Sequence, residues 1–383
     1  MEIVYISNYF NHHQSTLSDE FFKVTGGNYY FVETTPIPDF RLKLGYRKID
    51  RPYVLKYRDN ISFIDKLILE ADVVIHGEAP VSLIKNRVLL GKLTFHDNER
   101  RYKSWIKYLK WPIYTYNSLT LNKCYLLCAS AFAARDFALS GMNPKKCFKW
   151  GYFPQVECLD IRVADCISAI QESITHIMWC ARFIEWKHPE LPIKLAQKLK
   201  RDGFVFVIDM YGGGEEVEQI KSLSKSLGVD DVVRFHGSKQ NDEILREMRR
   251  HDIFLFTSDQ NEGWGAVLNE AMWSRCAVVA SHAIGAVPYL IEDGKNGLVF
   301  KSEDVDSLYE KTTKLLTNIS YRDSLRREAY DTVRDMWSAR NACRNFLLLC
   351  DVLMKGKDNP ILEGPCSAAP IMNHTDVKYL KNV

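Results

Sequence analysis

The sequence predicts an α/β protein with two doubly wound domains. Short, β-rich apolar runs alternate with longer segments of helical period over residues 2–150 and again over residues 175–281. This rhythm is typical of parallel sheets covered by helices. A weakly patterned polar stretch separates the two series, and 383 residues are too many for one core of ordinary size.

The elements are expected in the following order. In the first series, strands are expected over 2–6, 28–33, 72–77, 92–97 and 124–130, with a helix over 13–24. In the second series, strands are expected over 175–180, 204–211, 231–237, 252–258 and 276–281, with helices over 189–201, from Glu215, from Asp242 and through Leu268. Residues 304–352 have only helical patterns, and Asp304 and Ser338 are expected to be N-caps.

The domain boundaries follow from this order. We expect a first domain over 1–153, a hinge over 154–172 and a second domain over 173–336. A helix over 337–355 is expected to return to the first domain. The tail over 356–383 is rich in Pro, Gly and small residues, and we expect it to be poorly ordered.

Charge and cysteine content narrow the function classes. A net charge of +3 argues against a nucleic-acid partner, although residues 1–150 hold 22 Lys/Arg against 14 Asp/Glu. The ten cysteines are scattered without a CxxC pair, so we expect reduced thiols, with Cys124 and Cys128 packing rather than binding a metal. The start of the chain resembles no signal peptide and no later run is long enough to span a bilayer, so a cytoplasmic location is expected.

The most informative loop contains two carboxylates with seven residues between them, Glu262 and Glu270, at a loop-to-helix junction. The start of a helix offers free N–H groups and a positive dipole end, which suit a phosphate. Here we expect that phosphate site over Gly265, Ala266, Val267 and Leu268, with Gly263 and Gly265 allowing close approach. The flanking carboxylates suit sugar hydroxyls. The alternative is that both are ordinary solvated residues.

This loop and its surroundings resemble the family 4 retaining glycosyltransferases of the GT-B fold, the glycosyl transferases group 1. Besides the spaced carboxylates, the matching motifs are CARFIEWKHPE, YGGGEE, VVRFHG, AVVASHAIGAVP and EDGKNGLVF, in the order of the family. The resemblance implies two Rossmann-like domains that face one another across a cleft, with the nucleotide-sugar donor bound by the second domain. It departs from the family at Ala286 and Tyr289, where a glycine and an acidic residue are usual.

The resemblance also implies roles for individual residues. Arg182 and Lys187 correspond to the basic pair that holds the donor diphosphate, which agrees with the charge of that group. Glu270 corresponds to the residue that binds the ribose hydroxyls, and Glu262 to the one that contacts the transferred sugar. The glycines of the YGGGEE turn would let the chain pass close to the ligand, and two residues would belong to the base-binding loop; these are Gly212, Gly213, Gly214, His236 and Gly237.

In the first domain, the resemblance implies that His96, in the strand TFHD, faces the anomeric carbon of the donor sugar; a structural histidine is the alternative. The family's glycine pair after the first strand is replaced by a His-rich turn. Further candidates for contact with the acceptor or donor are Asn11, His12, His13, Gln14, His76 and Glu78.

The implied reaction retains the anomeric configuration, with the leaving diphosphate as the acceptor of the proton and Arg182, Lys187 and the helix start stabilising the charge. It needs no metal and no cofactor. The only Asp-x-Asp string, at 304–306, opens a helix and suits a cap better than a metal. A UDP- or GDP-sugar is therefore the expected donor.

The acceptor is expected to be a saccharide or a lipid-linked saccharide. Residues 100–111 interleave Lys and Arg with aromatic residues, which is typical of a helix that lies on an anionic membrane surface, or of a solvated basic helix that packs on its own domain. With the family resemblance, this favours bacterial surface polysaccharide or lipopolysaccharide synthesis. The rival functions are a nucleotide-sugar epimerase, a phosphorylase, a non-catalytic nucleotide-sugar binder and an NAD-dependent oxidoreductase, although the glycine spacing of the oxidoreductase is absent.

Overall fold

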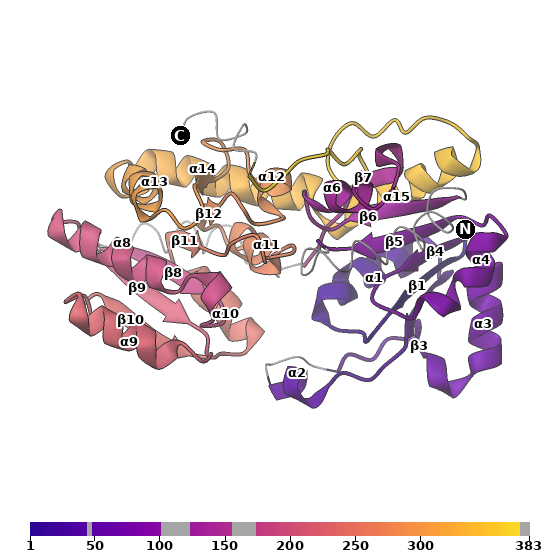
Figure 1. The fold of residues 1–383 in the computed structure, drawn as a ribbon, viewed down its shortest axis with the longest axis horizontal. Helices are drawn as coiled ribbons and strands as arrows, with labels where there is room; N and C mark the ends of the chain where they lie inside the picture. Colours follow the sequence, from indigo (N-terminus) through magenta and orange to yellow (C-terminus); the bar gives the residue numbers. More distant parts are fainter. Residues whose placement is uncertain (44–47, 101–122, 155–173, 376–383) are drawn as a thin grey trace. The chain divides into compact units, whose positions relative to one another are not determined.

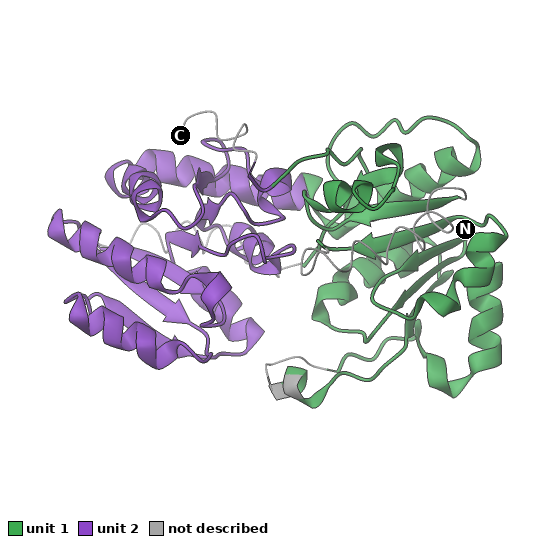
Figure 2. Cartoon of the chain, in the orientation of Figure 1, with its two compact units in different colours: residues 1–154, 336–373 green, residues 155–335, 374–383 purple. Residues whose placement is uncertain are grey.

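The computed structural model describes residues 1–43, 48–100, 123–154 and 174–375 and contains two compact units (Figures 1 and 2). Unit 1 comprises residues 1–154 and 336–373, and unit 2 comprises residues 155–335 and 374–383. The hinge expected over 154–172 lies almost entirely outside the described residues. Within the described part, no helix combines the length and apolar character needed to cross a membrane.

Unit 1 is built on a seven-stranded sheet in the order β3-β2-β1-β4-β5-β6-β7, and all its neighbouring strands pair in parallel. Its strands are β1 (Ile3–Ser7), β2 (Tyr29–Glu33), β3 (Val54–Lys56), β4 (Val73–His76), β5 (Thr94–Asn98), β6 (Cys124–Cys128) and β7 (Cys147–Lys149). Its helices include α1 (His12–Val24), α2 (Asp39–Lys43), α3 (Ile61–Glu70), α4 (Lys85–Leu89), α6 (Ala133–Ala138) and α15 (Ala339–Met354), with short 3-10 turns over Tyr57–Asp59, Val81–Leu83 and Pro144–Lys146.

Helices cover both faces of this sheet (Figure 1). On one face, apolar residues of α3, α4 and α6 pack on strand residues such as Val4, Ile6 and Val74. On the other face, α15 lies beside α1, and the ring of Phe346 contacts those of Phe21 and Phe95, with centroids 5.4 and 4.9 Å apart. A segment from the end of the chain thereby completes the core of the first unit.

The segment after α15 corrects one expectation, because part of the predicted poorly ordered tail is packed. Cys366 and Ser367 are buried. The Lys149 N–H donates to the Ser367 carbonyl at 2.7 Å, and the Ala369 N–H donates to the Cys147 carbonyl at 2.9 Å. The segment therefore pairs with the edge strand β7, which satisfies backbone groups that composition alone could not assign.

Unit 2 contains a six-stranded parallel sheet in the order β10-β9-β8-β11-β12-β13. Its strands are β8 (Thr175–Cys180), β9 (Phe206–Tyr211), β10 (Val233–Gly237), β11 (Ile253–Phe256), β12 (Ala277–Ser281) and β13 (Leu298–Phe300). Its helices are α8 (Glu190–Arg201), α9 (Val217–Ser226), α10 (Asn241–Met248), α11 (Ala266–Trp273), α12 (Val287–Leu290), α13 (Val305–Thr317) and α14 (Ile319–Asp331), with a 3-10 turn over Glu185–Lys187 and a π-helical turn over Thr332–Met336. The predicted α/β fold class is confirmed.

Side-chain caps define where the C-terminal helices begin, as predicted. The Asp304 carboxylate accepts from the N–H groups of Asp306 and Ser307, both at 3.0 Å, and the Ser338 hydroxyl accepts from the Asn341 N–H at 3.3 Å. Asp304 is thus a helix cap, and the Asp-x-Asp string is not arranged as a metal site. The eight cysteines within the described residues are free thiols, as expected.

Candidate functional site: a cation and carboxylate cluster in unit 2

The strand order of unit 2 reverses between β8 and β11, and ligands of doubly wound sheets bind at such a switch point beyond the carboxyl ends of the strands. The loop after β8 carries Lys187, and the loop after β11 carries Glu262. Their side chains meet in an ion pair between Nζ and Oε2, each only 11% exposed. The structure therefore brings two predicted site residues together at the position where a ligand is expected.

The turn that carries Lys187 is fixed by the neighbouring strand end. Thr257 donates its hydroxyl to the Lys187 carbonyl at 2.7 Å and accepts from the Trp179 indole N–H at 2.8 Å. The Asp259 N–H donates to the Trp186 carbonyl at 3.0 Å. Lys187 Nζ also lies 4.3 Å from the centroid of the Trp186 ring. The ammonium group is therefore held in place before any ligand binds.

Arg182 lies in the same loop but reaches the solvent. Its guanidinium carbon is 5.7 Å from the centroid of the Trp186 ring, and its side chain is exposed. Within the described part of the chain, it makes no ion pair with a carboxylate. A guanidinium in this state is available to a bidentate anion such as a phosphate.

Helix α11 begins beside these cations. Gly265 is its N-cap with φ 89°, and an added Cβ would lie 2.6 Å from the Phe256 ring, so glycine is required there. The Leu268 N–H already donates to the Gly265 carbonyl at 2.9 Å. Helix geometry leaves the amides of Ala266 and Val267 without an intrahelical partner. Of the predicted phosphate site over residues 265–268, these two amides are therefore the ones available to a ligand.

The two spaced carboxylates are buried, which excludes the alternative of ordinary solvated residues. Glu262 is 9% exposed and Glu270 is 8% exposed. Glu270 accepts a hydrogen bond from the Asn241 amide at 3.3 Å, and burial raises its pKa to about 7. A carboxylate kept in such a place at a cost in solvation is typical of a ligand site.

The loop over Gly285 and Ala286 supports Glu262, although its sequence departs from the family. The Gly285 N–H donates to the Glu262 carbonyl at 3.4 Å, and the Ala286 N–H donates to the Trp264 carbonyl at 3.2 Å. Tyr289 contacts Trp264, with ring centroids 6.2 Å apart. The departure from the family thus falls on residues that hold the backbone of the Glu262 loop.

The glycine turn after β9 packs closely against the protein's own chain. An added Cβ at Gly212 would lie 1.9 Å from the Ala181 carbonyl oxygen, and one at Gly214 would lie 2.3 Å from that of Phe183. Both have φ values that favour glycine, 129° and 156°. At Gly213 an added Cβ would meet Ser238 Oγ at 2.9 Å. The close approach is therefore to the protein's own chain, and these glycines shape the Arg182 loop.

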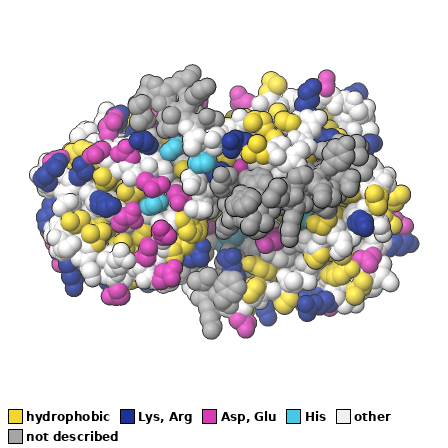
Figure 3. Space-filling view, viewed as in Figure 1, with side chains coloured by type: hydrophobic (Ala, Val, Ile, Leu, Met, Phe, Trp, Pro, Cys, Tyr) yellow, Lys and Arg dark blue, Asp and Glu magenta, His cyan; other side chains and the backbone are white. Residues whose placement is uncertain are grey.

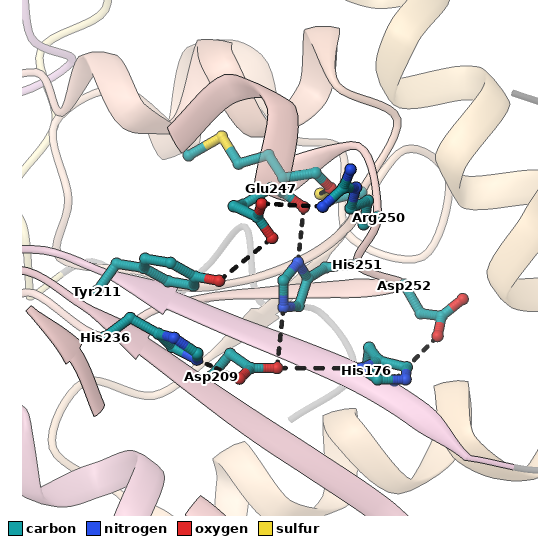
Figure 4. Close-up of polar contacts among 10 residues, drawn as sticks. His176, Asp209, Tyr211, His236, Glu247, Arg250, His251 and Asp252 are labelled. Atoms are coloured by element: carbon teal, nitrogen blue, oxygen red, sulfur yellow. Dashed lines mark hydrogen bonds and ion pairs between the residues drawn. The ribbon is translucent and has the colours of Figure 1, made fainter. Parts of the chain in front are cut away.

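The predicted base-binding residue His236 belongs to a network centred on the buried Asp209 (Figure 4). Asp209 contacts His236 Nε2 at 2.5 Å and His251 Nε2 at 3.1 Å. These hydrogen bonds outweigh the effect of burial and hold the pKa of Asp209 below its usual range. The His236 ring stacks on Tyr211 at 4.5 Å. His176 on β8 also lies near, with its Nδ1 3.9 Å from Asp209 Oδ2. The sequence did not reveal this network, since its members lie on three strands and one loop.

His251 makes two hydrogen bonds that hold its ring in this network. Its Nδ1 lies 2.7 Å from the Glu247 carbonyl oxygen, which can only accept. Its Nε2 faces the ionised Asp209, which also accepts. The His251 ring thus links the Glu247 carbonyl to the buried carboxylate of Asp209. Gly237, with φ 69°, accepts from the Gly212 N–H at 2.9 Å and ties this strand end to the glycine turn.

A second charged cluster adjoins Lys187. His188 has φ 50°, and its Nδ1 lies 3.1 Å from Glu190 Oε1. Burial alone would lower the pKa of His188, but the nearby carboxylates of Asp259, at 3.8 Å, and Glu190 raise it to about 10. His188, Asp259 and Glu303 are close enough together to hold a metal ion. Without a metal, the protonated imidazole forms an ion pair with these carboxylates, and a metal ion at this place would have to displace its proton.

In unit 1, the predicted residue His96 is buried beside His76. The two residues are paired in register on β5 and β4, and their Nδ1 atoms are 3.2 Å apart. The next residue, Asp97, accepts a hydrogen bond from the Tyr5 hydroxyl at 2.6 Å, and burial raises its pKa to about 7. Glu78 accepts from the Asn8 amide at 3.1 Å. Polar groups thus gather where β1, β4 and β5 end.

The His-rich turn after β1 has a structural role that the sequence left open. Asn11 is buried and caps α1, and its side chain accepts from the His13 N–H at 2.9 Å. His12 begins the helix, with its ring centroid 4.0 Å from that of His13. Burial lowers the pKa of His13 to about 3, so that imidazole is neutral. Asn11 therefore acts as the N-cap of α1, and its contact with a substrate stays a prediction.

The same edge of unit 1 has a cavity of about 260 Å³ beside the ends of β2 and β3. Its walls combine apolar residues with charged ones, including Phe10, Ile37, Val54, Glu33, Lys56 and Arg58. Lys56 and Arg58 are exposed, and neither makes an ion pair within the described residues.

The predicted basic aromatic segment 100–111 lies outside the described residues except for Arg100, which pairs with Asp136 at 3.2 Å. On the face of the molecule in Figure 3, charges of both signs are intermixed across the part that is described.

Comparison with known proteins agrees with this geometry. Residues 167–332 match the family model of the glycosyl transferases group 1. The chain is 28% identical over 170 residues to a D-inositol 3-phosphate glycosyltransferase of Corynebacterium aurimucosum, which covers 43% of this chain and 40% of the relative. It is 31% identical over 137 residues to the amylovoran biosynthesis glycosyltransferase AmsK of Erwinia amylovora, and this match covers 34% of this chain and 33% of the relative. The matches thus span less than half of these relatives.

Solved structures extend the likeness in fold to both units. The crystal structure of Anabaena HepE in complex with UDP has a TM-score of 0.69 at 13% identity and covers 93% of this chain and 100% of its own. The structure of WaaG, a glycosyltransferase involved in lipopolysaccharide biosynthesis, has a TM-score of 0.57 at 16% identity and covers 87% and 95%. The chain therefore has the GT-B fold, and residues 167–332 are similar to the glycosyl transferases group 1.

Proposed function

We propose that this protein is a retaining, metal-independent glycosyltransferase that moves a hexosyl or related sugar from a UDP- or GDP-sugar to a saccharide or lipid-linked acceptor. The observation that carries the proposal is the meeting of Lys187, Glu262 and the start of α11 at the switch point of the unit 2 sheet. Cations, free amides and buried carboxylates at one place match the parts of a nucleotide sugar.

The proposed chemistry is electrostatic. Arg182, Lys187 and the amides of Ala266 and Val267 stabilise the diphosphate as it leaves, and Lys187 has three donors, so it can bind phosphate and keep Glu262 in place. Glu262 accepts from hydroxyls of the transferred sugar, and Glu270 accepts from those of the ribose. The departing diphosphate takes the proton of the acceptor hydroxyl, so no metal and no separate base is required.

The proposed acceptor side is unit 1. His96 would orient the reacting groups, and the cavity beside β2 and β3 would hold a sugar ring of the acceptor, because its apolar walls suit C–H groups and its charged rim suits hydroxyls. Relatives named for amylovoran and colanic acid biosynthesis favour a surface polysaccharide or lipopolysaccharide pathway. We further propose a cytoplasmic location, with contact between residues 100–111 and the membrane surface.

The choice of donor is tested by thermal shift with UDP, GDP, ADP and NAD in the presence of EDTA. A ligand that binds the native state alone raises the melting temperature, so a response to UDP or GDP would support the proposal and name the base. A response to NAD alone would refute it. Donor turnover without acceptor, with a change in sugar configuration, would instead favour an epimerase, and binding without any turnover would favour a non-catalytic binder.

The role of Lys187 is tested by Lys187→Met. We expect kcat/KM for the donor to fall by about 10²- to 10³-fold, as when a positioned group loses its contact with the developing charge. The matched control is Lys194→Met, at an exposed position on α8 outside the loop, which should retain its activity. Equal activity in both variants would contradict the proposed diphosphate site.

A further inference from the structure

The two buried histidines of unit 1 form a pair whose chemistry is constrained by its geometry. His76 is the last residue of β4, and His96 lies opposite it on β5. Their exposed fractions are 4% and 3%, their Nδ1 atoms are 3.2 Å apart, and their ring planes meet at 75°. An N–H bond of one ring can therefore point into the ring plane of the other, as a hydrogen bond between imidazoles requires.

Only one proton can lie between these two nitrogens. Two bare Nδ1 atoms at this distance would repel each other, and so would two Nδ1–H groups, whereas one donor and one acceptor form a hydrogen bond. When both rings are neutral, the ring with Nδ1–H has a bare Nε2, and its partner has Nε2–H. The pair can take up one further proton but cannot become doubly charged while the bond is kept.

The surroundings keep this arrangement in place. In register, Ile6 of β1 flanks His76, and Leu126 of β6 flanks His96. Both flanking side chains are fully buried. The backbone of the strand end is held by the Gly77 N–H, which donates to the Ile6 carbonyl at 2.8 Å. Water is thus kept from the flanks that the strands cover, and a hydrogen bond in such surroundings is stronger than one in water.

We infer that His76 is a positioning residue that fixes the tautomer and the ring orientation of His96. The tautomer decides whether His96 Nε2 donates to or accepts from a group of the substrate, and a second ring that selects it therefore decides which contact His96 can make. The tautomer part of the inference stands on the geometry of the pair, while its effect on turnover rests on the proposed function.

The pair itself is tested by NMR without any substrate. Two-bond ¹H–¹⁵N correlation of the imidazole rings reports which ring nitrogens carry protons. His76 and His96 signals are assigned by their loss in His76→Asn and His96→Asn, each checked for folding by its melting curve. One and only one protonated Nδ1 between the two residues is expected. Two bare or two protonated Nδ1 atoms would overturn the inference.

The effect on catalysis is tested with three variants of His76. Asn places its amide where Nδ1 lies and can still bond to His96, Gln places its amide near the position of Nε2, and Leu has no polar atom. With UDP-glucose and GDP-mannose as the donors, we expect kcat to fall about 10- to 100-fold in His76→Leu and His76→Gln but to remain within about threefold in His76→Asn. KM for the donor should not change.

These outcomes separate failure of the pair from failure of the proposed function. If kcat is the same in the Leu, Gln and Asn variants while all remain folded, His76 does not position His96. If the NMR result holds but His96→Ala keeps full turnover, the pair exists and the role proposed for His96 in transfer is wrong. If neither donor is turned over by the native protein, the proposed function fails and the NMR result still decides on the pair.

Discussion

The candidate donor site contains two buried carboxylates, Glu262 and Glu270, which have different partners. Glu262 is paired with Lys187, so its charge is compensated within the protein. Within the described residues, the neutral amide of Asn241 is the only hydrogen-bond donor to the Glu270 side chain, and burial raises the pKa of Glu270 to about 7. A site that binds hydroxyl groups leaves acceptors incompletely satisfied until the ligand arrives, and Glu270 has this property.

The prediction at the residue scale is that Glu270→Gln stabilises the protein while it weakens donor binding. In the folded protein the Glu270 pKa is about 7, against 4.5 for an ordinary glutamate. The folded state therefore binds this proton more tightly, and stability is lost as pH rises through the window between these two values. At pH 8 we expect the free energy of unfolding to rise by about 3 kcal/mol in Glu270→Gln, with a much smaller gain at pH 5.

Denaturant unfolding at both pH values checks this prediction. The control is Glu218→Gln, at a side chain on α9 that is 84% exposed, which should change little at either pH. A gain in Glu270→Gln that is equal at pH 5 and pH 8 would show that its carboxyl group is not the source of the pH dependence. Weaker binding of the diphosphate nucleotide in the same variant would show that stability was exchanged for function.

At the scale of the elements, the sequence predicts the helices and strands whose own residues show a clear pattern of buried positions. The longer strands are continuous apolar runs because both faces of a parallel sheet are covered. Strands β3, β7 and β13 have three residues each and give no such signal. Helix α12 has four residues and is held by the Glu262 loop, so its position depends on tertiary contacts that no local pattern contains.

The same distinction applies to the site. Spacing and family likeness pointed to Arg182, Lys187, Glu262 and Glu270 because these belong to local motifs. They did not reveal that Thr257 holds the Lys187 turn or that Asp209 collects three histidines, since these partners come from separate strands. They also did not reveal that Gly212 and Gly214 lie against the backbone of residues 181–183.

The prediction at the element scale concerns this glycine turn. Gly212→Ala would place a Cβ on the Ala181 carbonyl at a φ of 129°, and the strand end must shift to accommodate it. We expect a loss of about 3 kcal/mol or more in stability and a disordered Arg182 loop. Gly228→Ala is the matched control, with φ 64° and open space around the added Cβ; it should cost about 1 kcal/mol.

Urea unfolding of both variants, together with nucleotide binding, checks the expectation. The decisive quantity is the difference between them, because both carry the general cost of an alanine in a left-handed region. If Gly212→Ala were no less stable than Gly228→Ala, the turn would accommodate the added Cβ without cost. The conclusion that these glycines shape the Arg182 loop would then be wrong.

At the scale of the whole molecule, the chain does not divide into two consecutive domains. Unit 1 takes its core from residues 1–154 and from α15, whose Phe346 contacts Phe21 and Phe95. The segment over 364–369 then covers the edge strand β7. A parallel sheet built from the N-terminal residues alone would leave this edge and the apolar face under α15 exposed. The C-terminal residues are thus part of the fold of unit 1.

This arrangement predicts that removing residues 356–383 destabilises unit 1 although α15 is kept. The truncation deletes the backbone hydrogen bonds of Cys366, Ser367 and Ala369 with β7, and it exposes apolar surface that Cys366 and Ala369 now cover. Each lost hydrogen bond contributes about 1 kcal/mol, so we expect a loss of a few kcal/mol in the free energy of unfolding.

The control is a chain that ends at residue 375, which keeps these contacts and should melt like the full chain. If the truncation at 355 also melted like the full chain, the 364–369 segment would not contribute to the stability of the edge. Unfolding of unit 2 can be monitored by the protection that a bound nucleotide gives. If the loss of stability appeared only there, the assignment of this segment to unit 1 would be wrong. Hydrogen exchange at the amides of β7 locates the effect, because protection lost there and kept on β8 identifies unit 1 as the part that opens.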